Sequence, residues 1–163
     1  MDMMERDEEN LDRVDVVVRG LRPGDLDQVV RIDAKLTGRT RSEYFKVKLA
    51  QNLQETGIKV SLAAESKGDF VGFLLARVFY GEFGLLEPTA ILDTIGVHPD
   101  FSNQGIGRAL LRQLNVHLAG LHVTHVQTQV EWRNIELLKF FQKAGYEPAP
   151  RFCLSLEIKP GSP

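Results

Sequence analysis

A glycine pair between an apolar run and an amphipathic segment is the part of this sequence best suited to chemistry. Gly105 and Gly107 follow the apolar run 91–97 and a polar loop that starts at Pro99. Glycine allows a sharp turn and a close backbone approach, so several N–H groups can point outward together. The helix expected at 106–118 adds unpaired N–H groups and the positive end of its dipole. This order of strand, turn and helix predicts a site for a phosphate.

Two cations follow the glycine pair. The sequence does not match two better-known phosphate-binding loops, the Walker loop and the Rossmann fingerprint. Arg108 and Arg112 stand one turn apart on the expected helix. A Walker loop requires Gly-Lys-Ser/Thr, whereas Arg108 and Ala109 follow the second glycine, and the Rossmann fingerprint requires a small residue where Leu110 stands. The pattern therefore argues against nucleotide hydrolysis and hydride transfer. An ordinary strand-to-helix connection with tightly packed glycines is the alternative.

Two segments of the chain resemble the motifs of one protein family. The stretch VHPDFSNQGIGRALL resembles the acetyl-CoA-binding segment of the GCN5-related N-acetyltransferases (GNAT). The stretch NIELLKFFQKAGYEP, which begins at Asn134, resembles their next conserved segment, in the family's order and at about its usual separation. A weaker similarity opens with VRGLRPGDLDQVVRID, so the resemblance covers about 16–158. It implies the GNAT fold, acetyl-CoA as the cofactor and acyl transfer as the activity.

The resemblance also implies where the coenzyme binds. The pyrophosphate is expected at the glycine turn, and the thioester is expected beside Val97, whose N–H would polarise the thioester oxygen. Ser102 stands where the family usually has Arg or Gln, which is expected to weaken this site without abolishing it. Asn134 is expected to cap its helix, to support the pantetheine arm, or to do both. The predicted coenzyme-binding residues are Ile95, Val97, Gln104, Gly105, Ile106, Gly107, Arg108, Ala109, Asn134 and Phe141.

The residues available for proton transfer differ from those that the family usually has. Attack on a thioester needs a neutral amine, so a base or a water chain must take its proton. The tyrosine acid of many family members falls at Phe141, which has no hydroxyl, and the glutamate base of the ribosomal-protein alanine N-acetylases falls at Gln129. Glu131 shares a face with Gln129 on the strand predicted at 123–131, so it is the first candidate for the catalytic base. Asp93, on the neighbouring strand, is the second.

A locally basic segment is expected to border the acceptor. Its four cations precede or lie within the helix predicted at 42–55: Arg39, Arg41, Lys46 and Lys48. A solvated charged face is the simpler interpretation of each one. Because this region usually borders the acceptor site in the family, we hypothesise that Arg39 or Arg41 contacts an anionic part of the acceptor. Tyr44 and Gln129 complete the predicted acceptor-binding residues.

The rest of the chain predicts an α/β (α+β) fold. Strands are expected at 14–18, 59–64, 70–79, 90–97, 123–131 and 151–158, and helices from Leu26, at 42–55, at 106–118 and at 134–143. Gly38 is expected to end the first helix, Lys67-Gly68-Asp69 to form a tight hairpin turn, and Ala144-Gly145 to cap the last helix. The resembled fold is a single domain with a mixed, mostly antiparallel sheet, flanked by helices, whose central parallel strands splay apart. We predict one domain at 14–160 after a flexible acidic tail at 1–13.

Composition bounds the possible partners and compartments. The chain has 163 residues, 43% of them hydrophobic, and a formal net charge of −2. A chain of this length buries one hydrophobic core. Its small net charge produces no overall electrostatic attraction for nucleic acid or an acidic membrane. The lone Cys153 is expected in the core of a strand, and the absence of a Cys/His cluster with zinc-ligand spacing predicts no metal. The lack of a long apolar run and of a signal-like start predicts a soluble cytoplasmic protein.

Three hypotheses for the function follow. The first is an N-acetyltransferase that moves an acetyl group from acetyl-CoA to a primary amine, on a small molecule or a peptide, by direct attack in a ternary complex. The second is a non-catalytic acyl-CoA-binding module that regulates or senses, which Phe141 and Gln129 favour. The third is an interaction domain without a cofactor. Segment 151–158 could also pair across a homodimer.

Overall fold

The computed structural model describes residues 15–54, 59–81, 84 and 86–161 of this chain. The tail predicted at 1–13 lies outside these residues. The chain divides into two compact units, Met1–Gln129 and Val130–Pro163. The first holds the whole sheet, and the second holds one helix and the C-terminal segment.

A five-stranded mixed sheet forms the frame of the first unit, with the strand order β1-β2-β3-β4-β5. Its strands are β1 Val16–Gly20, β2 Leu62–Ser66, β3 Asp69–Phe79, β4 Thr89–Val97 and β5 His125–Thr128. From β1 to β4, each strand pairs antiparallel with the next strand along the chain, and β4 pairs parallel with β5. The predicted tight turn between β2 and β3 is confirmed, because Lys67 and Gly68 both have positive φ angles (52° and 89°), as a two-residue hairpin requires.

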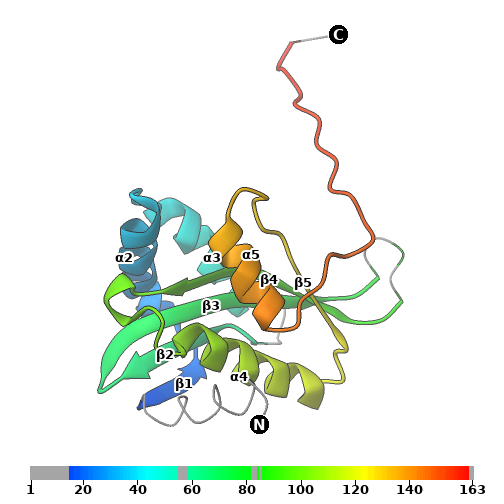
Figure 1. Ribbon diagram of the computed structural model, residues 1–163. Coiled ribbons are helices and arrows are strands. Elements are labelled where there is room, and N and C mark those ends of the chain that lie inside the picture. The colour runs from blue at the N-terminus through cyan, green and yellow to red at the C-terminus, as the bar shows by residue number, and fades with distance from the viewer. Residues whose placement is uncertain (1–14, 55–58, 82–83, 85, 162–163) are drawn as a thin grey trace. The chain divides into compact units, whose positions relative to one another are not determined.

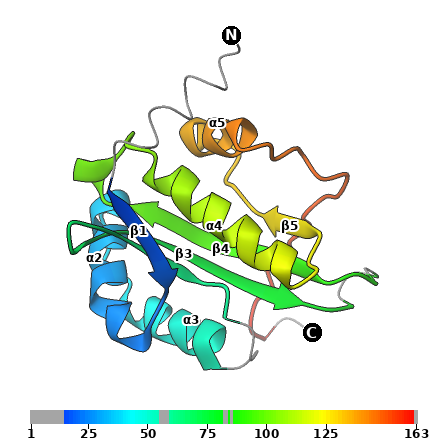
Figure 2. The ribbon, with the colours of Figure 1, turned by 90° about the horizontal axis from the view of Figure 1, so that it is seen from below.

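Helices cover both faces of this sheet. The helices α2 (Leu26–Thr37) and α3 (Ser42–Gln54) contact β3 on one face, and α4 (Ile106–Gly120) packs on the other (Figures 1 and 2). The α4 crossover makes the parallel β4–β5 pair possible, since parallel strands cannot be joined by a tight turn. Gly38 ends α2 in the left-handed conformation (φ 70°) and donates to the Ala34 carbonyl at 2.9 Å, as its position in the sequence predicts.

The core lies in two layers on either side of β3. Phe45, Ile32 and Phe73 are buried between β3 and helices α2 and α3. On α4, an apolar stripe at intervals of about one turn is buried: Ile106, Leu110, Leu114 and Leu118. Because both faces of β3 are covered, its residues from 71 to 76 are all buried, which explains their continuous apolar sequence.

The second unit contains the helix α5 (Ile135–Lys143) between two well-formed caps. The Asn134 side chain accepts from the Leu137 N–H at 3.2 Å, so the predicted N-cap is confirmed. At the other end Gly145 has a φ of 89°, and the N–H groups of Gly145 and Tyr146 donate to Gln142 and Phe141. This pair of hydrogen bonds is a Schellman motif.

Several predicted strands differ from those observed. β1 and β2 lie two or three residues later than predicted, and β5 covers only four residues of the predicted 123–131. The strand predicted at 151–158 is wrong: no strand forms there, and Cys153 is exposed rather than in a core. The fold class is confirmed, although the parallel pair lies at one end of the sheet because no sixth strand follows β5 among the described residues.

Candidate active site

The sheet opens where β5 ends. Parallel pairing of β4 and β5 stops at Leu92 and Thr128, where the Thr128 hydroxyl donates to the Leu92 carbonyl at 2.9 Å. Pairing of β4 with β3 continues to Val97. The edge of β4 from Asp93 to Val97 therefore extends beyond its parallel neighbour, which agrees with the splayed pair that the resemblance implied.

A β-bulge at Asp93 marks the start of this opening. Leu75 pairs with Thr94, and the next residue of β3, Ala76, pairs with Leu92, so Asp93 is an extra residue on β4. A bulge disrupts the ladder locally and redirects the side chain that it carries. The bulge accounts for the short β5, because a regular parallel ladder cannot continue past it.

The backbone of Val97 faces the open side of β4. The N–H of the next residue, His98, donates to the Val71 carbonyl of β3 at 2.8 Å. Backbone groups of successive strand residues point to opposite sides, so the Val97 and Ile95 N–H groups point away from β3. A carbonyl oxygen that lies along this edge would accept from a fixed backbone donor.

The glycine turn is built as its sequence predicts. Gly105 is the N-cap of α4 with a φ of 80°, and the Ala109 N–H donates to the Gly105 carbonyl at 2.9 Å. The N–H groups of Ile106 and Gly107 precede that first helical bond and have no acceptor within the helix. No acidic side chain lies in the first turn, and Gln104 is exposed directly before it.

These residues fit the pyrophosphate of a coenzyme. The backbone donors and the helix dipole favour negative charge at this helix end, and Arg108 adds a cation in the first turn of α4. A left-handed glycine at the cap leaves no side chain over these donors.

Asp93 lies in a basic environment on the side of the sheet that α3 covers. Its Oδ1 is 3.6 Å from Lys48 Nζ, and its Oδ2 is 3.9 Å from Arg77 Nε. Both distances exceed those of a hydrogen bond. Oδ2 is also buried and has no hydrogen-bond partner among the described residues. Asp93 is thus flanked by two cations, yet its Oδ2 lacks a hydrogen bond. Lys48 belongs to the basic segment expected to border the acceptor, whereas nothing in the sequence pointed to Arg77.

Three of the four predicted acceptor residues lie at the junction of α2 and α3, namely Arg39, Arg41 and Tyr44. The fourth, Gln129, is exposed directly after the end of β5. The Arg41 guanidinium forms a bidentate ion pair with Asp33, whose side chain is 5% exposed, and its Cζ lies 5.0 Å from the Tyr44 ring centroid. This pairing raises the pKa of Arg41, mainly through the hydrogen bonds to Asp33. Tyr44 is 41% exposed, and Arg39 is exposed. Arg41 therefore joins the two helices, while Arg39 and Tyr44 face solvent.

The predicted base Glu131 lies outside any strand. The residues from Gln129 to Glu131 follow the end of β5, and Glu131 is exposed at the start of a turn closed by a 2.8 Å hydrogen bond from the Asn134 N–H to the Glu131 carbonyl. Strand alternation therefore does not put Glu131 on the face of Gln129, because the strand ends at Thr128.

In the second unit a hydroxyl lies beside Phe141 that the sequence analysis missed. The Phe141 and Tyr146 rings are 4.9 Å apart, and the Tyr146 hydroxyl is buried without a hydrogen-bond partner among the described residues. Burial raises the pKa of this phenol, so it stays protonated and can donate one hydrogen bond. The motif had placed a tyrosine only at the position of Phe141, and no sequence signal marked Tyr146.

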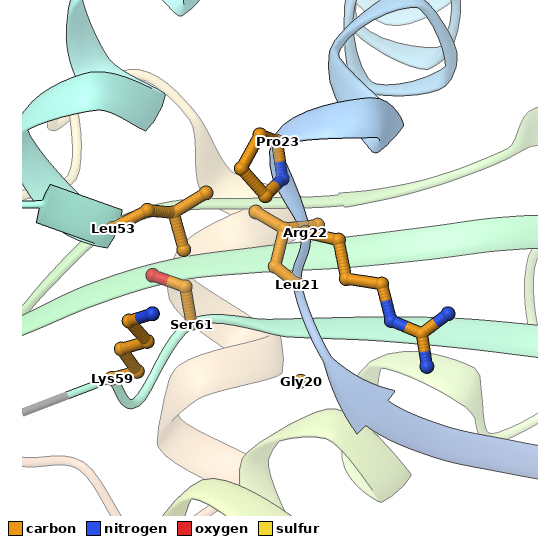
Figure 3. A pocket seen from close by; sticks show the side chains of 7 residues that line it. All are labelled: Gly20, Leu21, Arg22, Pro23, Leu53, Lys59 and Ser61. Atoms are coloured by element: carbon orange, nitrogen blue, oxygen red, sulfur yellow. The ribbon is translucent and has the colours of Figure 1, made fainter.

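A separate hollow of about 490 Å³ lies between the end of β1 and the start of β2 (Figure 3). It is lined by Gly20, Leu21, Arg22, Pro23, Leu53, Lys59 and Ser61, none of them a predicted site residue. The Ser61 hydroxyl is already bonded to the Ala76 backbone at 3.1 Å, and the Arg22 side chain extends away from Ser61 and Lys59 in Figure 3. The hollow therefore holds none of the predicted site residues, and the hydroxyl in its lining is already bonded to the backbone.

The described residues contain neither a membrane-spanning helix nor a cluster of metal ligands. None of the helices observed there is both long and apolar enough to cross a membrane. Within the same residues, no three His, Cys, Asp or Glu side chains are grouped so as to hold a metal ion.

Comparisons with known proteins agree with the fold and with the motif resemblance. A model of the acetyltransferase (GNAT) family matches residues 27–146. Mycothiol acetyltransferase from Propionibacterium freudenreichii subsp. shermanii is 30% identical over 132 residues, which cover 77% of this chain and 41% of that protein. The chain thus spans about two fifths of the length of that relative.

Solved structures with lower sequence identity also resemble this chain in fold. Aminoglycoside 6'-N-acetyltransferase AAC(6')-Ih from Acinetobacter baumannii superimposes with a TM-score of 0.74 at 16% identity, covering 88% of this chain and 99% of that one. Aminoglycoside N-acetyltransferase AAC(6')-Iy, solved in complex with CoA, gives a TM-score of 0.73 at 18% identity, over 87% of this chain and 94% of that one. At these identities the likeness establishes the fold. Because the family model covers most of the chain, the protein belongs to the GNAT family of acetyltransferase enzymes.

Proposed function

We propose that this protein transfers an acetyl group from acetyl-CoA to a primary amine by direct attack in a ternary complex. The observation that carries the proposal is the open edge of β4, which continues to Val97 and leads through the glycine turn into the N-terminus of α4. One continuous segment thus presents backbone donors for a carbonyl oxygen and then for a pyrophosphate. Family membership and the CoA bound in a structural neighbour support the choice of coenzyme.

Each part of the coenzyme has its own residues in this proposal. Residues 104–109 hold the pyrophosphate through backbone N–H groups and the Arg108 side chain. The N–H of Val97, with Ile95 beside it, donates to the thioester oxygen, and Asn134 supports the pantetheine arm in addition to capping α5. Phe141 contributes an apolar contact to the coenzyme. Acetyl-CoA supplies the acyl carbon that the amine attacks.

Proton transfer is assigned to Asp93 rather than to Glu131. As the new C–N bond forms and the C–S bond breaks, the amine nitrogen loses a proton and the sulfur leaves as a thiolate, which needs little acid assistance. Asp93 Oδ2 is buried and unsatisfied, so it can accept that proton directly or through water. Glu131 is exposed and lies outside any strand, which makes it the second candidate. Gln129 and Tyr44 are proposed to contact the acceptor.

Calorimetric titration of acetyl-CoA tests the coenzyme site. We expect micromolar binding, roughly −8 kcal/mol, to the wild type and its loss in Gly107→Trp, whose indole would cover the backbone donors. Gly120→Trp is the matched control, because a Cβ at that opposite end of α4 would meet no atom within 4 Å. Failure of the folded wild type to bind acetyl-CoA would overturn the proposal.

A non-catalytic acyl-CoA-binding module is the second candidate function. Phe141 lacks the hydroxyl of a proton donor, and Glu131 lies away from the strand, which favours this alternative. Consumption of acetyl-CoA in the presence of an amine panel separates the two, with Asp93→Asn as the catalytic control. Binding without consumption for every amine would identify the non-catalytic module.

A further inference from the structure

We infer that the acceptor is a primary amine that also carries an anionic group, a carboxylate or a phosphate, a few bonds from its nitrogen. The inference rests on the proposed function and names the class of its acceptor. It is drawn from Asp93, Lys48 and Arg77, which all belong to the first unit.

Asp93 supplies the part of the site that recognises the amine. Its carboxylate is fixed on the bulge of β4, and its Oδ2 accepts no hydrogen bond among the described residues. A buried carboxylate oxygen without a donor is costly, so a ligand that brings a donor is favoured there. An ammonium group is such a donor, and it then loses its proton to the same oxygen.

Lys48 and Arg77 supply the part that recognises an anion. Both lie within 4.0 Å of Asp93, yet neither is close enough to make a hydrogen bond with it. Two cations therefore face one carboxylate, which leaves one positive charge in excess. Neighbouring Arg41 does not change this balance, since Asp33 neutralises it. A ligand with one ammonium and one anionic group satisfies all three side chains at once.

The same charges disfavour a polycation. An acceptor with several ammonium groups would bring like charges to Lys48 and Arg77 and would find only one unsatisfied carboxylate. Tyr44 strengthens the contrast, because its ring lies 6.0 Å from Lys48 Nζ and 5.0 Å from Arg41 Cζ and is already placed beside two cations. The acceptor expected here thus differs from the aminoglycosides named for the structural neighbours.

The test compares acceptors in matched pairs. Acetylation of α- and ω-amino acids is measured against their amides, and acetylation of phosphoethanolamine against ethanolamine, so that each pair differs in the anionic group. The two kinds of pair separate carboxylate from phosphate. Spermidine represents polycations. Acetyl-CoA binding is measured in parallel for every variant.

We expect kcat/KM to favour the anionic member of at least one pair by roughly tenfold or more, the effect of one charge-assisted contact. Lys48→Gln and Arg77→Gln should each remove most of that preference, while Lys48→Arg should retain it. Lys46→Gln is the matched control, since Lys46 is exposed on the same helix and points elsewhere. Circular dichroism verifies that each variant is folded.

The possible failures are distinguishable. Equal or better acetylation of amides, ethanolamine and spermidine by the wild type would overturn the inference about the acceptor and leave the acetyltransferase intact. A preference for anionic acceptors that survives in both Lys48→Gln and Arg77→Gln would also overturn it. Binding of acetyl-CoA with no acetylation of any amine would overturn the proposed function and this inference with it.

Discussion

Substitution of Gly96 by alanine tests the packing that holds the open edge of β4. Gly96 stands directly before Val97, and a Cβ at Gly96 would lie 2.7 Å from Phe73 Cε1 and 3.0 Å from Phe73 Cζ. It would also lie 3.3 Å from Leu36 Cδ1. Carbon atoms in contact are about 3.5–4.0 Å apart, so the Phe73 ring must retreat by about 1 Å.

The ring has little room for that retreat. Phe73 is fully buried and packs edge-to-face against Phe45, with 5.9 Å between the ring centroids. Overpacking of this kind lowers the free energy of unfolding by about 1–3 kcal/mol. Alanine has less conformational entropy than glycine in the unfolded chain, which raises the free energy of unfolding by about 0.4–1 kcal/mol. We therefore expect Gly96→Ala to lower the free energy of unfolding by about 1–2 kcal/mol.

Urea unfolding followed by circular dichroism measures this loss. Gly20→Ala is the matched control, because a Cβ there meets no atom within 4 Å and should leave stability unchanged or slightly raised. In a Phe73→Leu background, the smaller side chain should reduce the cost of Gly96→Ala. If Gly96→Ala is as stable as Gly20→Ala in the wild-type background, then Phe73 does not confine this glycine and the reasoning is wrong.

Three further substitutions test separate parts of the structure. Arg41→Gln should lower the free energy of unfolding by about 1–2 kcal/mol, because buried Asp33 loses its partner although the pair is partly screened, and Asp33→Asn in the same background should restore part of that loss. Burial alone would raise the pKa of Asp25, but hydrogen bonds from Arg19 lower this pKa below its ordinary value of 3.8. The ionised carboxylate therefore gives its full stabilisation well above pH 3.8 and loses it as the pH falls below 3.8, through the lowered pKa of the folded state. Asp25→Asn should flatten this acid limb of the curve of unfolding free energy against pH. Asn134→Ala should cost about 1 kcal/mol of stability through the lost cap, whereas Asn134→Asp should keep the cap, so weaker acetyl-CoA binding in Asn134→Asp would reveal the second role of the amide.

Local sequence signals predicted the turns and helix ends well. Gly38, Gly105 and Gly145 all adopt left-handed conformations at helix ends, and the Lys67–Gly68 turn joins β2 to β3 as expected. Each of these features depends on one or two residues whose backbone preference is intrinsic. The helix α4 also follows directly from its apolar spacing.

Features that depend on distant pairing were not predictable in the same way. Segment 151–158 has the alternation of a strand, yet Phe152 and Leu154 are 96% and 90% exposed, because alternation gives a strand a face but does not provide a partner. The length of β5 was overestimated because its end is set by the bulge at Asp93 in a different strand. The expected position of Glu131 on a strand face depends on the same overestimated strand length.

The bulge at Asp93 links the part of the site proposed for the coenzyme with the part proposed for the acceptor. The extra residue at Asp93 ends the β4–β5 ladder, which exposes the backbone edge that runs to Val97. The same extra residue turns the Asp93 carboxylate toward Lys48 of α3. Removal of one residue from this part of β4 would restore the regular register and would shift the side-chain alternation of the strand between its two faces. The opening proposed for the thioester and the carboxylate proposed for the amine therefore have one structural cause, and neither is expected to survive without the other.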